Sequence, residues 1–330
     1  MNHKKKYPLH QCALYKCRSP MMLEKKLKTE KGVLDDISKI VVYNNFSIEK
    51  NFLGEMRSIQ SPNRDLKTIQ KRILKLLQKI ERPNWLISGE KGKSYIDNGK
   101  AHLDAKYALT VDIKSFYGNC SREYVYSFFH ERMQMDGDVA GIITDIVTYQ
   151  NGIPTGTPTS QMIAYYAYED MFNEISKVAN KYNCTFTLYV DDMSFSSTGY
   201  FKHKTLISEI DIILRKYGHK LKSSKIKYYG KHQSKIITGT VVTQNNTLKV
   251  PNRNQKKIYD NFQEIKVIKC ITKNNQQELK LYKTLRGQLT SAQGIEDSIF
   301  PEVNRIVSSI NVEEETSKKA KRKHHHKSNN

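Results

Sequence analysis

The segment Tyr189-Val190-Asp191-Asp192 constrains the fold of this chain most, because it sets two adjacent carboxylates inside an apolar stretch. The flanking residues 186–188 and 193–195 are of types that favour β-strands. Aspartate is depleted in strands, and two neighbouring carboxylates repel each other. A divalent cation would offset that repulsion, since Mg²⁺ prefers carboxylate oxygens together with phosphates. An ordinary acidic hairpin tip is the alternative that the segment alone leaves open.

A second strand that ends in a carboxylate lies upstream. Residues 107–113 read Tyr-Ala-Leu-Thr-Val-Asp-Ile, which predicts a buried strand reaching Asp112. The chain between this strand and the Asp pair is long enough for helices to cross and bring the two strands side by side, where three carboxylates would hold two metal ions for an in-line phosphoryl displacement. We therefore expect Asp112, Asp191 and Asp192 to be catalytic ligands of two Mg²⁺ ions, with Mn²⁺ as the alternative. The Ile113 carbonyl would complete one metal shell.

The charge of the chain points to a polyanionic partner. Its 330 residues include 55 Lys and Arg but 33 Asp and Glu, which gives a formal net charge of +22. Such an excess repels itself in the compact state unless a polyanion neutralises it, so nucleic acid is the expected partner. The 20 Tyr and 11 Phe residues suit stacking on unpaired bases.

The sequence also bears on the compartment. No apolar stretch reaches about 18 residues, the length that a membrane-spanning helix needs. The basic N-terminus is not followed by the apolar core of a signal peptide. The five Cys are odd in number and scattered, which is typical of reduced cytosolic thiols. We expect a soluble cytoplasmic protein with no membrane partner.

Helical and extended patterns alternate along the chain. Strands are expected over 107–113, over 186–195 as a strand–turn–strand, and in short pieces up to residue 250. Apolar residues at helical spacing predict helices over 33–40, 66–80, 122–133, 139–149, 161–178, 205–217, 252–268 and 279–289. This mixture predicts an α+β fold.

Three motifs occur in the order found in reverse transcriptases. Residues 112–117, Asp-Ile-Lys-Ser-Phe-Tyr, resemble the first catalytic motif of that family, and residues 189–192 resemble the second. Between them, residues 152–160, Gly-Ile-Pro-Thr-Gly-Thr-Pro-Thr-Ser, resemble the template-side Pro/Gly loop. The segment Arg57-x-Ile59-x-x-Pro62 is similar to the fingers motif of the bacterial members. The likeness extends to about residue 289 and covers most of the chain.

Two further signatures resemble those of retron reverse transcriptases. Asn98-Gly99-Lys100-Ala101-His102 is similar to their Asn-Ala-x-x-His signature, with Gly99 in place of the usual Ala. Ile237-Thr238-Gly239 resembles their Val-Thr-Gly signature, and Leu285-Arg286-Gly287 is also retron-like. On these motifs the chain is identified as a member of the bacterial retron reverse transcriptases.

The resemblance implies an α+β right-hand polymerase fold with fingers, an antiparallel-sheet palm and a helical thumb. The catalytic carboxylates would lie in the palm. The expected parts are an N-terminal extension (1–45), fingers (46–106, with part of 120–150), palm (107–243), helical thumb and RNA-binding region (244–312) and a disordered basic tail (313–330).

A group of nucleotide-binding residues follows from the resemblance. Arg64 would help to neutralise the incoming triphosphate, with a solvated helix start as the alternative. Lys225 would protonate the leaving pyrophosphate, unless it is an ordinary surface lysine. The whole group comprises Arg57, Arg64, Phe116, Tyr117, Thr155, Gly156 and Lys225.

Phe116 or Tyr117 would lie under the sugar and exclude a 2′-hydroxyl, with an ordinary core aromatic as the alternative. The family usually has Gln at the position of Thr155 and Pro at that of Gln161, so nucleotide contact at Thr155 differs from the family pattern.

A group of RNA-binding residues is also implied. Asn98 and His102 would bind the retron RNA or order the fingers, and a buried hydrogen-bonded pair is the alternative. Thr238-Gly239 would approach the RNA backbone or form a bulge. Basic side chains on the thumb helices would contact phosphates without reading sequence. The group comprises Asn98, His102, Thr238, Gly239, Arg253, Lys256, Lys257 and Arg286.

The function that the resemblance implies is RNA-directed DNA polymerisation in the bacterial cytoplasm. The enzyme would use dNTPs to copy a cognate noncoding RNA, primed from a 2′-hydroxyl of that RNA, into branched msDNA. Retrons act in antiphage defence, so an effector (toxin) protein is an expected partner. The alternatives are another bacterial defence or abortive-infection reverse transcriptase and a catalytically idle RNA-binding scaffold. The intact Asp112, Asp191 and Asp192 argue against the scaffold.

Overall fold

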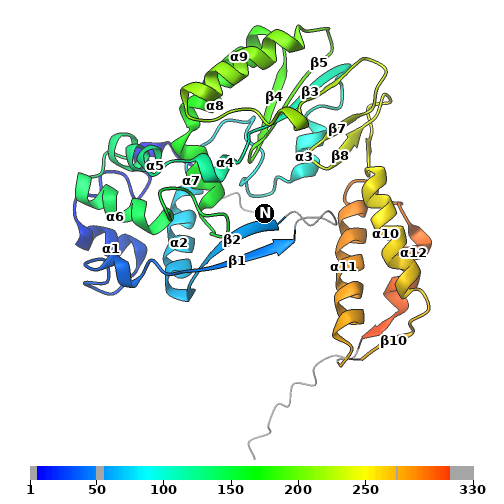
Figure 1. Ribbon diagram of the computed structural model, residues 1–330, viewed down its shortest axis with the longest axis horizontal. Coiled ribbons are helices and arrows are strands. Elements are labelled where there is room, and N and C mark those ends of the chain that lie inside the picture. The colour runs from blue at the N-terminus through cyan, green and yellow to red at the C-terminus, as the bar shows by residue number, and fades with distance from the viewer. Residues whose placement is uncertain (1–5, 50–55, 273, 313–330) are drawn as a thin grey trace, which may run out of the picture. The chain divides into compact units, whose positions relative to one another are not determined.

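Two clusters of buried apolar side chains organise the chain into two compact units, residues 1–248 and 249–330. The boundary lies close to the one expected between palm and thumb, at residues 243 and 244. A computed structural model, drawn in Figure 1, describes residues 6–49, 56–272 and 274–312.

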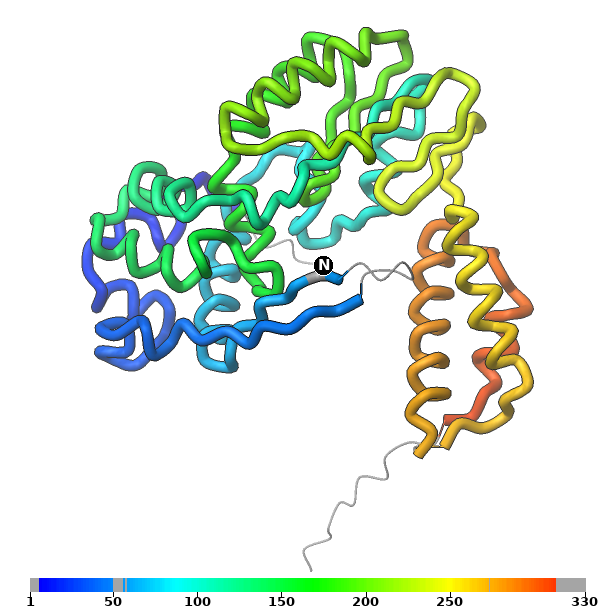
Figure 2. Tube along the Cα trace, in the orientation of Figure 1, coloured from blue at the N-terminus to red at the C-terminus, as the bar shows by residue number. Residues whose placement is uncertain are grey.

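The first unit alternates helices and strands, as the trace in Figure 2 shows. Its α-helices are α1 (Pro20–Leu27), α2 (Arg64–Leu77), α3 (Tyr95–Lys100), α4 (Phe116–Asn119), α5 (Arg122–Ser127), α6 (Gly137–Val147), α7 (Ser160–Ala167), α8 (Glu169–Lys181) and α9 (His203–Lys216). Its 3-10 helices are η1 (Leu9–Gln11), η2 (Ile37–Lys39) and η4 (Ser223–Lys225), and α5 continues into a π-helix, η3 (Phe128–Arg132). Its strands are β1 (Tyr43–Glu49), β2 (Met56–Pro62), β3 (Tyr107–Asp112), β4 (Thr185–Tyr189), β5 (Asp192–Ser197), β6 (Lys227–Tyr229), β7 (Lys235–Ile237), β8 (Thr240–Val242) and β9 (Leu248–Lys249), the last of which reaches the unit boundary.

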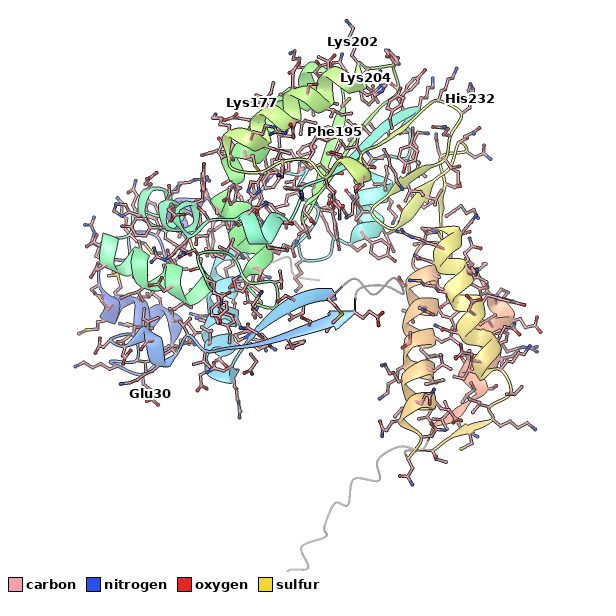
Figure 3. All side chains as sticks on the ribbon, viewed as in Figure 1. Glu30, Lys177, Phe195, Lys202, Lys204 and His232 are labelled. Carbon is pink, nitrogen blue, oxygen red and sulfur yellow. The ribbon has the colours of Figure 1, made fainter. Side chains whose placement is uncertain are left out.

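An antiparallel sheet with strand order β4-β5-β3-β6 forms the centre of this unit. Side chains alternate between the faces of a sheet, so Phe186 and Phe195, which are register partners, share one face. On that face α8 packs against β4, and α9 packs against α8 (Figure 1). Phe195 is buried beneath this layer, and the side chains exposed on its outer side include Lys177, Lys202 and Lys204 (Figure 3).

The segment expected as an N-terminal extension shares the core of the first unit. Its side chains Leu14, Cys17, Leu23 and Leu27 are buried in the same apolar cluster as the sheet. Residues 6–45 are therefore an integral layer of this unit, because removing them would expose part of its core.

Helix α2 directly follows the ribbon of β1 and β2 in the sequence. Asn63 caps α2 by accepting a hydrogen bond from the Leu66 N–H, and the predicted apolar stripe is buried, which confirms this helix. The antiparallel β1–β2 ribbon is held to the unit through Tyr43, whose ring packs on that of Tyr149 with a centroid distance of 4.5 Å.

The helix predicted over 33–40 is wrong, and only the 3-10 turn η2 forms there. The backbone conformation of Gly32, with φ at 80°, turns the chain before the apolar pattern starts. The buried Glu24 carboxylate then accepts the Leu34 N–H at 3.1 Å, which gives that donor a partner outside any helix. The helix predicted over 161–178 is divided at Tyr168 into α7 and α8.

The second unit is helical, with a core of its own that includes Ile258, Leu285 and Val307. Its elements are α10 (Asn252–Ile265), β10 (Cys270–Ile271), α11 (Gln276–Gln293), α12 (Pro301–Ser309) and β11 (Asn311–Val312), with β10 and β11 parallel. The expected basic tail, 313–330, lies outside the described residues. Over the parts of the chain that the structure describes, none of the helices is both long and apolar enough to span a membrane.

Candidate active site

The strand register brings the predicted carboxylates together at one end of the central sheet. Asp112, the last residue of β3, is the register partner of Asp192, the first residue of β5. The Ile113 N–H donates to the Asp191 carbonyl oxygen at 3.3 Å, which continues the pairing past the strand end. Asp112 is 5% exposed, whereas Asp191 and Asp192 are partly exposed. Three carboxylates thus lie together at one end of the strands, called the carboxylate edge below.

The electrostatics of this edge show a surplus of negative charge. Burial, the neighbouring charges of Asp191 and Asp112, and a hydrogen bond with Asp112 raise the pKa of Asp192 to about 7. The Lys225 ammonium lies 2.6 Å from Asp112 Oδ1 and is the cation that compensates the group. Burial alone would lower the pKa of Lys225, but the hydrogen bond and the charge of Asp112 outweigh it, so that pKa is raised.

The donor set fits a divalent metal. All its side-chain donors are carboxylate oxygens, which hard cations prefer, and the raised pKa of Asp192 shows that the group favours an added positive charge. Among the described residues, no group of three or more His, Cys, Asp or Glu side chains is arranged to hold a metal ion by itself. Mg²⁺ usually takes one or two carboxylates and completes its shell with water and substrate phosphates.

The two aromatic candidates of the first motif differ in position. Phe116 is 3% exposed and packs among Tyr168, Phe172 and His219, so it is a core residue and not a sugar contact. Tyr117 is half-buried at the same helix start. Tyr117 is therefore the aromatic residue of this pair that remains a candidate for the sugar.

The Pro/Gly loop is tied to strand β2 by the residue that departs from the family pattern. The Thr155 N–H donates to Gln60 Oε1 at 3.0 Å, and its hydroxyl donates to the Ser58 carbonyl oxygen at 2.9 Å. A Cβ added to Gly156 would overlap the Gln60 carbonyl oxygen, so this close approach needs glycine. Thr155 therefore positions the loop, and Gln60 places beside it the amide group that the family usually carries on the loop.

The two arginine candidates lie in the ribbon region. Arg64 is exposed in the first turn of α2. Arg57 belongs to β2, but its side chain lies outside the described parts of the structure. Both remain predictions for the triphosphate.

The retron-like signatures contact each other inside the protein. Asn98 is fully buried and its amide donates to the Thr238 hydroxyl at 2.7 Å. His102 is 1% exposed, with Nδ1 2.6 Å from Ser196 Oγ and Nε2 2.8 Å from Thr187 Oγ1. The expectation that Asn98 and His102 touch RNA is therefore wrong for this structure, because their polar atoms face the protein.

The turn at Thr238 and Gly239 is partly accessible. Both residues have positive φ, 39° and 88°, and Gly239 lies next to the Tyr95 ring. This backbone forms the tight turn that joins β7 to β8, whereas the alternative expected to an RNA contact was a bulge.

The thumb candidates belong to the second unit. The side chains of Arg253, Lys256 and Lys257 are exposed on α10, and Arg286 is exposed on α11, where it donates to Ser308 Oγ at 2.9 Å. A groove of about 420 Å³ separates the two helices and is lined partly by Lys257. These cations remain predicted phosphate contacts.

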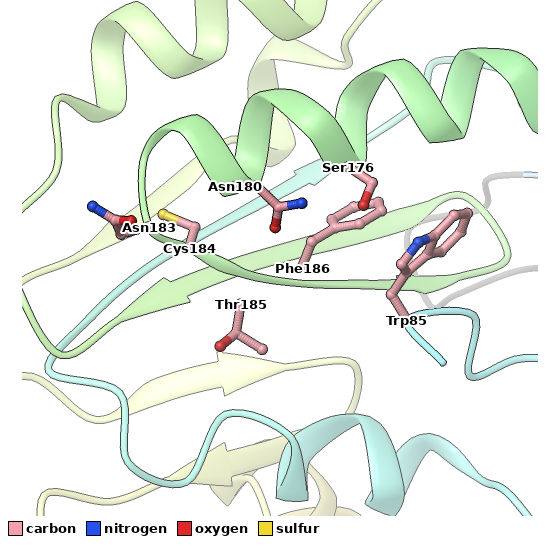
Figure 4. Close-up of a pocket in the computed structure, with 7 residues that line it drawn as sticks. All are labelled: Trp85, Ser176, Asn180, Asn183, Cys184, Thr185 and Phe186. Atoms are coloured by element: carbon pink, nitrogen blue, oxygen red, sulfur yellow. The ribbon is translucent and has the colours of Figure 1, made fainter. Parts of the chain in front are cut away.

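A hollow of about 460 Å³ in the first unit lies away from the three carboxylates. It lies where β4 begins, between α8 and Trp85 (Figure 4). Its lining includes Asn180 and Thr185 but none of the carboxylates at the other end of the sheet. This hollow is therefore separate from the carboxylate group.

Sequence reasoning missed residues whose role depends on contacts distant in the chain. Gln60 carries no motif of its own, and Ser88 lies in a segment without a regular pattern, yet its hydroxyl accepts the Val190 N–H at 2.8 Å. The only advance signal was the departure at Thr155, which indicated that this loop would make different contacts.

Comparison with known proteins agrees with this geometry. The family model described as reverse transcriptase (RNA-dependent DNA polymerase) matches residues 48–242. Retron Ec86 reverse transcriptase of Escherichia coli is 26% identical over 204 residues, 61% of this chain and 63% of that protein. Retron Se72 reverse transcriptase of Salmonella heidelberg (strain 579083-10) is 31% identical over 178 residues, 53% and 47% of the two chains. Retron Ec48 reverse transcriptase of Escherichia coli is 24% identical over 263 residues, 77% and 62% of the two chains.

These matches define the family of the chain. The matching parts span between 47% and 63% of the length of these relatives. The family match covers strand β2 and the four-stranded sheet with its acidic turn, so the predicted α+β right-hand polymerase fold is confirmed. The chain belongs to the reverse transcriptase (RNA-dependent DNA polymerase) family, in its bacterial retron branch.

Proposed function

We propose that this chain is the RNA-directed DNA polymerase of a retron and that it copies a cognate noncoding RNA into branched msDNA. The observation that carries the proposal is the register pairing of Asp112 with Asp192, next to Asp191 at the turn. Rigid strands hold these carboxylates, and metal-dependent nucleotidyl transfer needs its ligands placed to a fraction of an ångström.

Each residue of the site has its own proposed role. Asp112, Asp191 and Asp192 would hold two Mg²⁺ ions, which supply charge stabilisation for an in-line attack on the nucleotide α-phosphate. Lys225 neutralises Asp112 from within the protein, and it is the proposed proton donor to the leaving pyrophosphate. Tyr117 is the proposed contact to the deoxyribose.

The substrates follow from charge and family. The net charge of +22 supports a nucleic-acid partner, and the retron relatives support a dedicated RNA template with dNTPs. We place the exposed thumb cations Arg253, Lys256 and Lys257 on the phosphate backbone of that RNA. The msDNA product and an effector protein in an antiphage system complete the proposal.

The test is to express the gene with its flanking DNA and to isolate the nucleic acid that copurifies with the protein. The double variant Asp191→Asn with Asp192→Asn is compared with Asp170→Asn, which removes an exposed carboxylate from α8. A short DNA joined to RNA through a ribonuclease-resistant branch is expected from the wild type and from the Asp170 variant only.

The other outcomes separate the alternatives. DNA without a branch would assign the chain to a different class of defence reverse transcriptase. RNA without DNA in every preparation would contradict polymerase activity and leave an RNA-binding scaffold.

A further inference from the structure

The turn that carries the catalytic pair has an unusual backbone. Val190, between β4 and β5, has φ at 63°, in the left-handed region. A β-branched residue rarely adopts this conformation, because its Cβ substituents crowd the backbone. Such a residue is strained and persists only where the surroundings fix it. Some neighbouring contact must therefore hold this turn.

A non-helical segment lies along the outer edge of β4 and supplies that contact. The Leu188 N–H donates to the Trp85 carbonyl oxygen at 2.8 Å, and the Ile87 N–H donates to the Leu188 carbonyl oxygen at 3.0 Å. These bonds add the segment to the sheet as a short parallel neighbour of β4. One step further along, Ser88 Oγ accepts the Val190 N–H at 2.8 Å.

The segment is itself anchored at both ends. At its start the Trp85 ring packs against Phe186, with a centroid distance of 5.3 Å, and Figure 4 shows the two side chains next to each other. Beyond Ser88, the Glu90 carboxylate is paired with the buried Arg82 and with Lys6. The burial of Glu90 opposes these pairs, but they still lower the pKa of its carboxyl group.

Ser88 is the hydrogen-bond acceptor that the structure gives the Val190 N–H. It is 5% exposed, whereas Val190 is partly exposed, and the hydrogen bond between them is partly buried. An N–H that loses its partner in the protein interior is destabilising. Because the strained conformation already carries a cost, that loss would favour relaxation of the turn and displacement of the adjacent Asp191.

We propose that Ser88 is a positioning residue for the catalytic turn, holding Val190 in its left-handed conformation so that Asp191 and Asp192 keep their places beside Asp112. The proposal rests on the polymerase function proposed above. It concerns a residue outside the family motifs, in the segment between α2 and α3.

The test compares Ser88→Ala with Ser88→Thr, which keeps the hydroxyl, and with Ser176→Ala, which removes a half-buried hydroxyl from α8. Nucleotide incorporation on an RNA template with a DNA primer gives kcat and KM, and amide hydrogen exchange reports on peptides covering 186–195. Ser88→Ala is expected to lower kcat by about tenfold to a hundredfold at little changed nucleotide KM, since small misplacements of a catalytic group have effects of this size. Exchange at the turn should accelerate, while Ser176→Ala changes neither quantity.

A second variant pair tests the cause. Val190→Gly removes the strain, because glycine adopts positive φ readily. Ser88→Ala should therefore lower kcat several-fold less in the Val190→Gly background than in the wild type. Unchanged exchange and kcat in Ser88→Ala, or an equal loss in both backgrounds, would overturn the proposal. A wild type without polymerase activity would refute the proposed function, while the exchange experiment would still decide whether Ser88 holds the turn.

Discussion

At the scale of single residues, the close packing of one backbone segment on another shapes the site as much as its carboxylates do. Gly156 brings the Pro/Gly loop against the backbone of β2, and an added Cβ would overlap the Gln60 carbonyl oxygen. Backbone cannot yield as a flexible side chain can, so the contact fixes the distance between loop and ribbon. The loop and the ribbon should therefore respond together to a change at either one.

Gly156→Ala is expected to lower the free energy of unfolding by about 1–3 kcal/mol, the usual cost of overpacking. Urea unfolding of the purified protein measures this difference. Gly141→Ala is the matched control, because a Cβ at Gly141 in α6 meets nothing within 4 Å. The control should gain about 0.5–1 kcal/mol from the better helix propensity of alanine. A Gly156 variant as stable as the wild type would contradict the packing described for the loop.

Single residues were predictable from the sequence where the chemistry itself is unusual. Asp112, Asp191 and Asp192 stood out because carboxylates are rare in strands, and the strand register then placed them together. His102 could be recognised but not placed, because its hydroxyl partners are distant in the chain and belong to other strands. Ser88 gave no signal, since its importance comes from the backbone conformation of another residue.

At the scale of elements, α3 connects two sheets. On one side His102, just after α3, contacts the central sheet, and on the other Asn98 contacts the β7–β8 turn. Gly99 lies so close to β8 that a Cβ would overlap Thr240 Oγ1. This overlap explains why the chain has glycine where the retron signature usually has alanine.

Gly99→Ala should therefore destabilise the protein, although alanine is the better helix former. Thr240→Ala removes the obstructing hydroxyl together with its bond to the Ile237 carbonyl oxygen, 2.9 Å away. In a double-mutant cycle, the two changes together should cost about 0.5–3 kcal/mol less than the sum of the single changes. Thermal or urea unfolding of the four proteins measures the coupling, and strict additivity would show that the two residues do not oppose each other.

The buried His102, just after α3, also predicts that the stability of the protein depends on pH. Burial lowers the pKa of His102 to about 4 in the folded protein, whereas an unfolded histidine titrates near 6.5. Between these values the unfolded chain binds the proton and the folded chain does not, so the free energy of unfolding falls as the pH falls. This contribution is fully present above pH 6.5 and amounts to about 3 kcal/mol. Burial lowers the pKa of His219 in the same way, to about 4.

Urea unfolding at several values between pH 4 and pH 7 tests this expectation. His102→Gln removes one titrating ring, so its stability should change less steeply with pH than that of the wild type. His219 and carboxyl groups with shifted pKa values, Asp192 among them, supply the remaining dependence in both proteins. Equal slopes in the two proteins would contradict a neutral buried His102.

Elements were predictable where one face is apolar over several turns. Helix α2 matches its stripe because Asn63 caps it and its apolar side chains reach the core. At 33–40 the chain turns at Gly32 and only the 3-10 turn η2 forms, while the Glu24 carboxylate from another helix accepts the Leu34 N–H. This contact with Glu24 is tertiary, and no local pattern contains it.

At the scale of the whole molecule, charge is the property that the sequence states most directly. The chain has 55 basic against 33 acidic residues, and the thumb cations Arg253, Lys256 and Lys257 are exposed. Each lysine or arginine that contacts a phosphate releases counterions, so RNA binding should weaken with salt. With about four such contacts, the slope of log affinity against log salt would be about −4.

Titration of a fluorescent RNA hairpin between 50 and 200 mM salt measures this slope. Lys256→Gln should make it less steep by about one, because one phosphate contact is lost. Lys177→Gln removes an exposed lysine from α8 of the first unit and should leave it unchanged. An equal effect of both changes would indicate that charge acts diffusely and not through the thumb.

The most direct test of the account is primer extension by the purified protein on an RNA template with Mg²⁺ and dNTPs. The wild type should extend a DNA primer, and Asp191→Asn should reduce the rate by about a thousandfold or more while its thermal unfolding stays close to that of the wild type. Asp170→Asn should extend the primer normally. Extension by Asp191→Asn at the wild-type rate, or no extension by any of the three folded proteins, would contradict the assignment of the carboxylate edge as a polymerase active site.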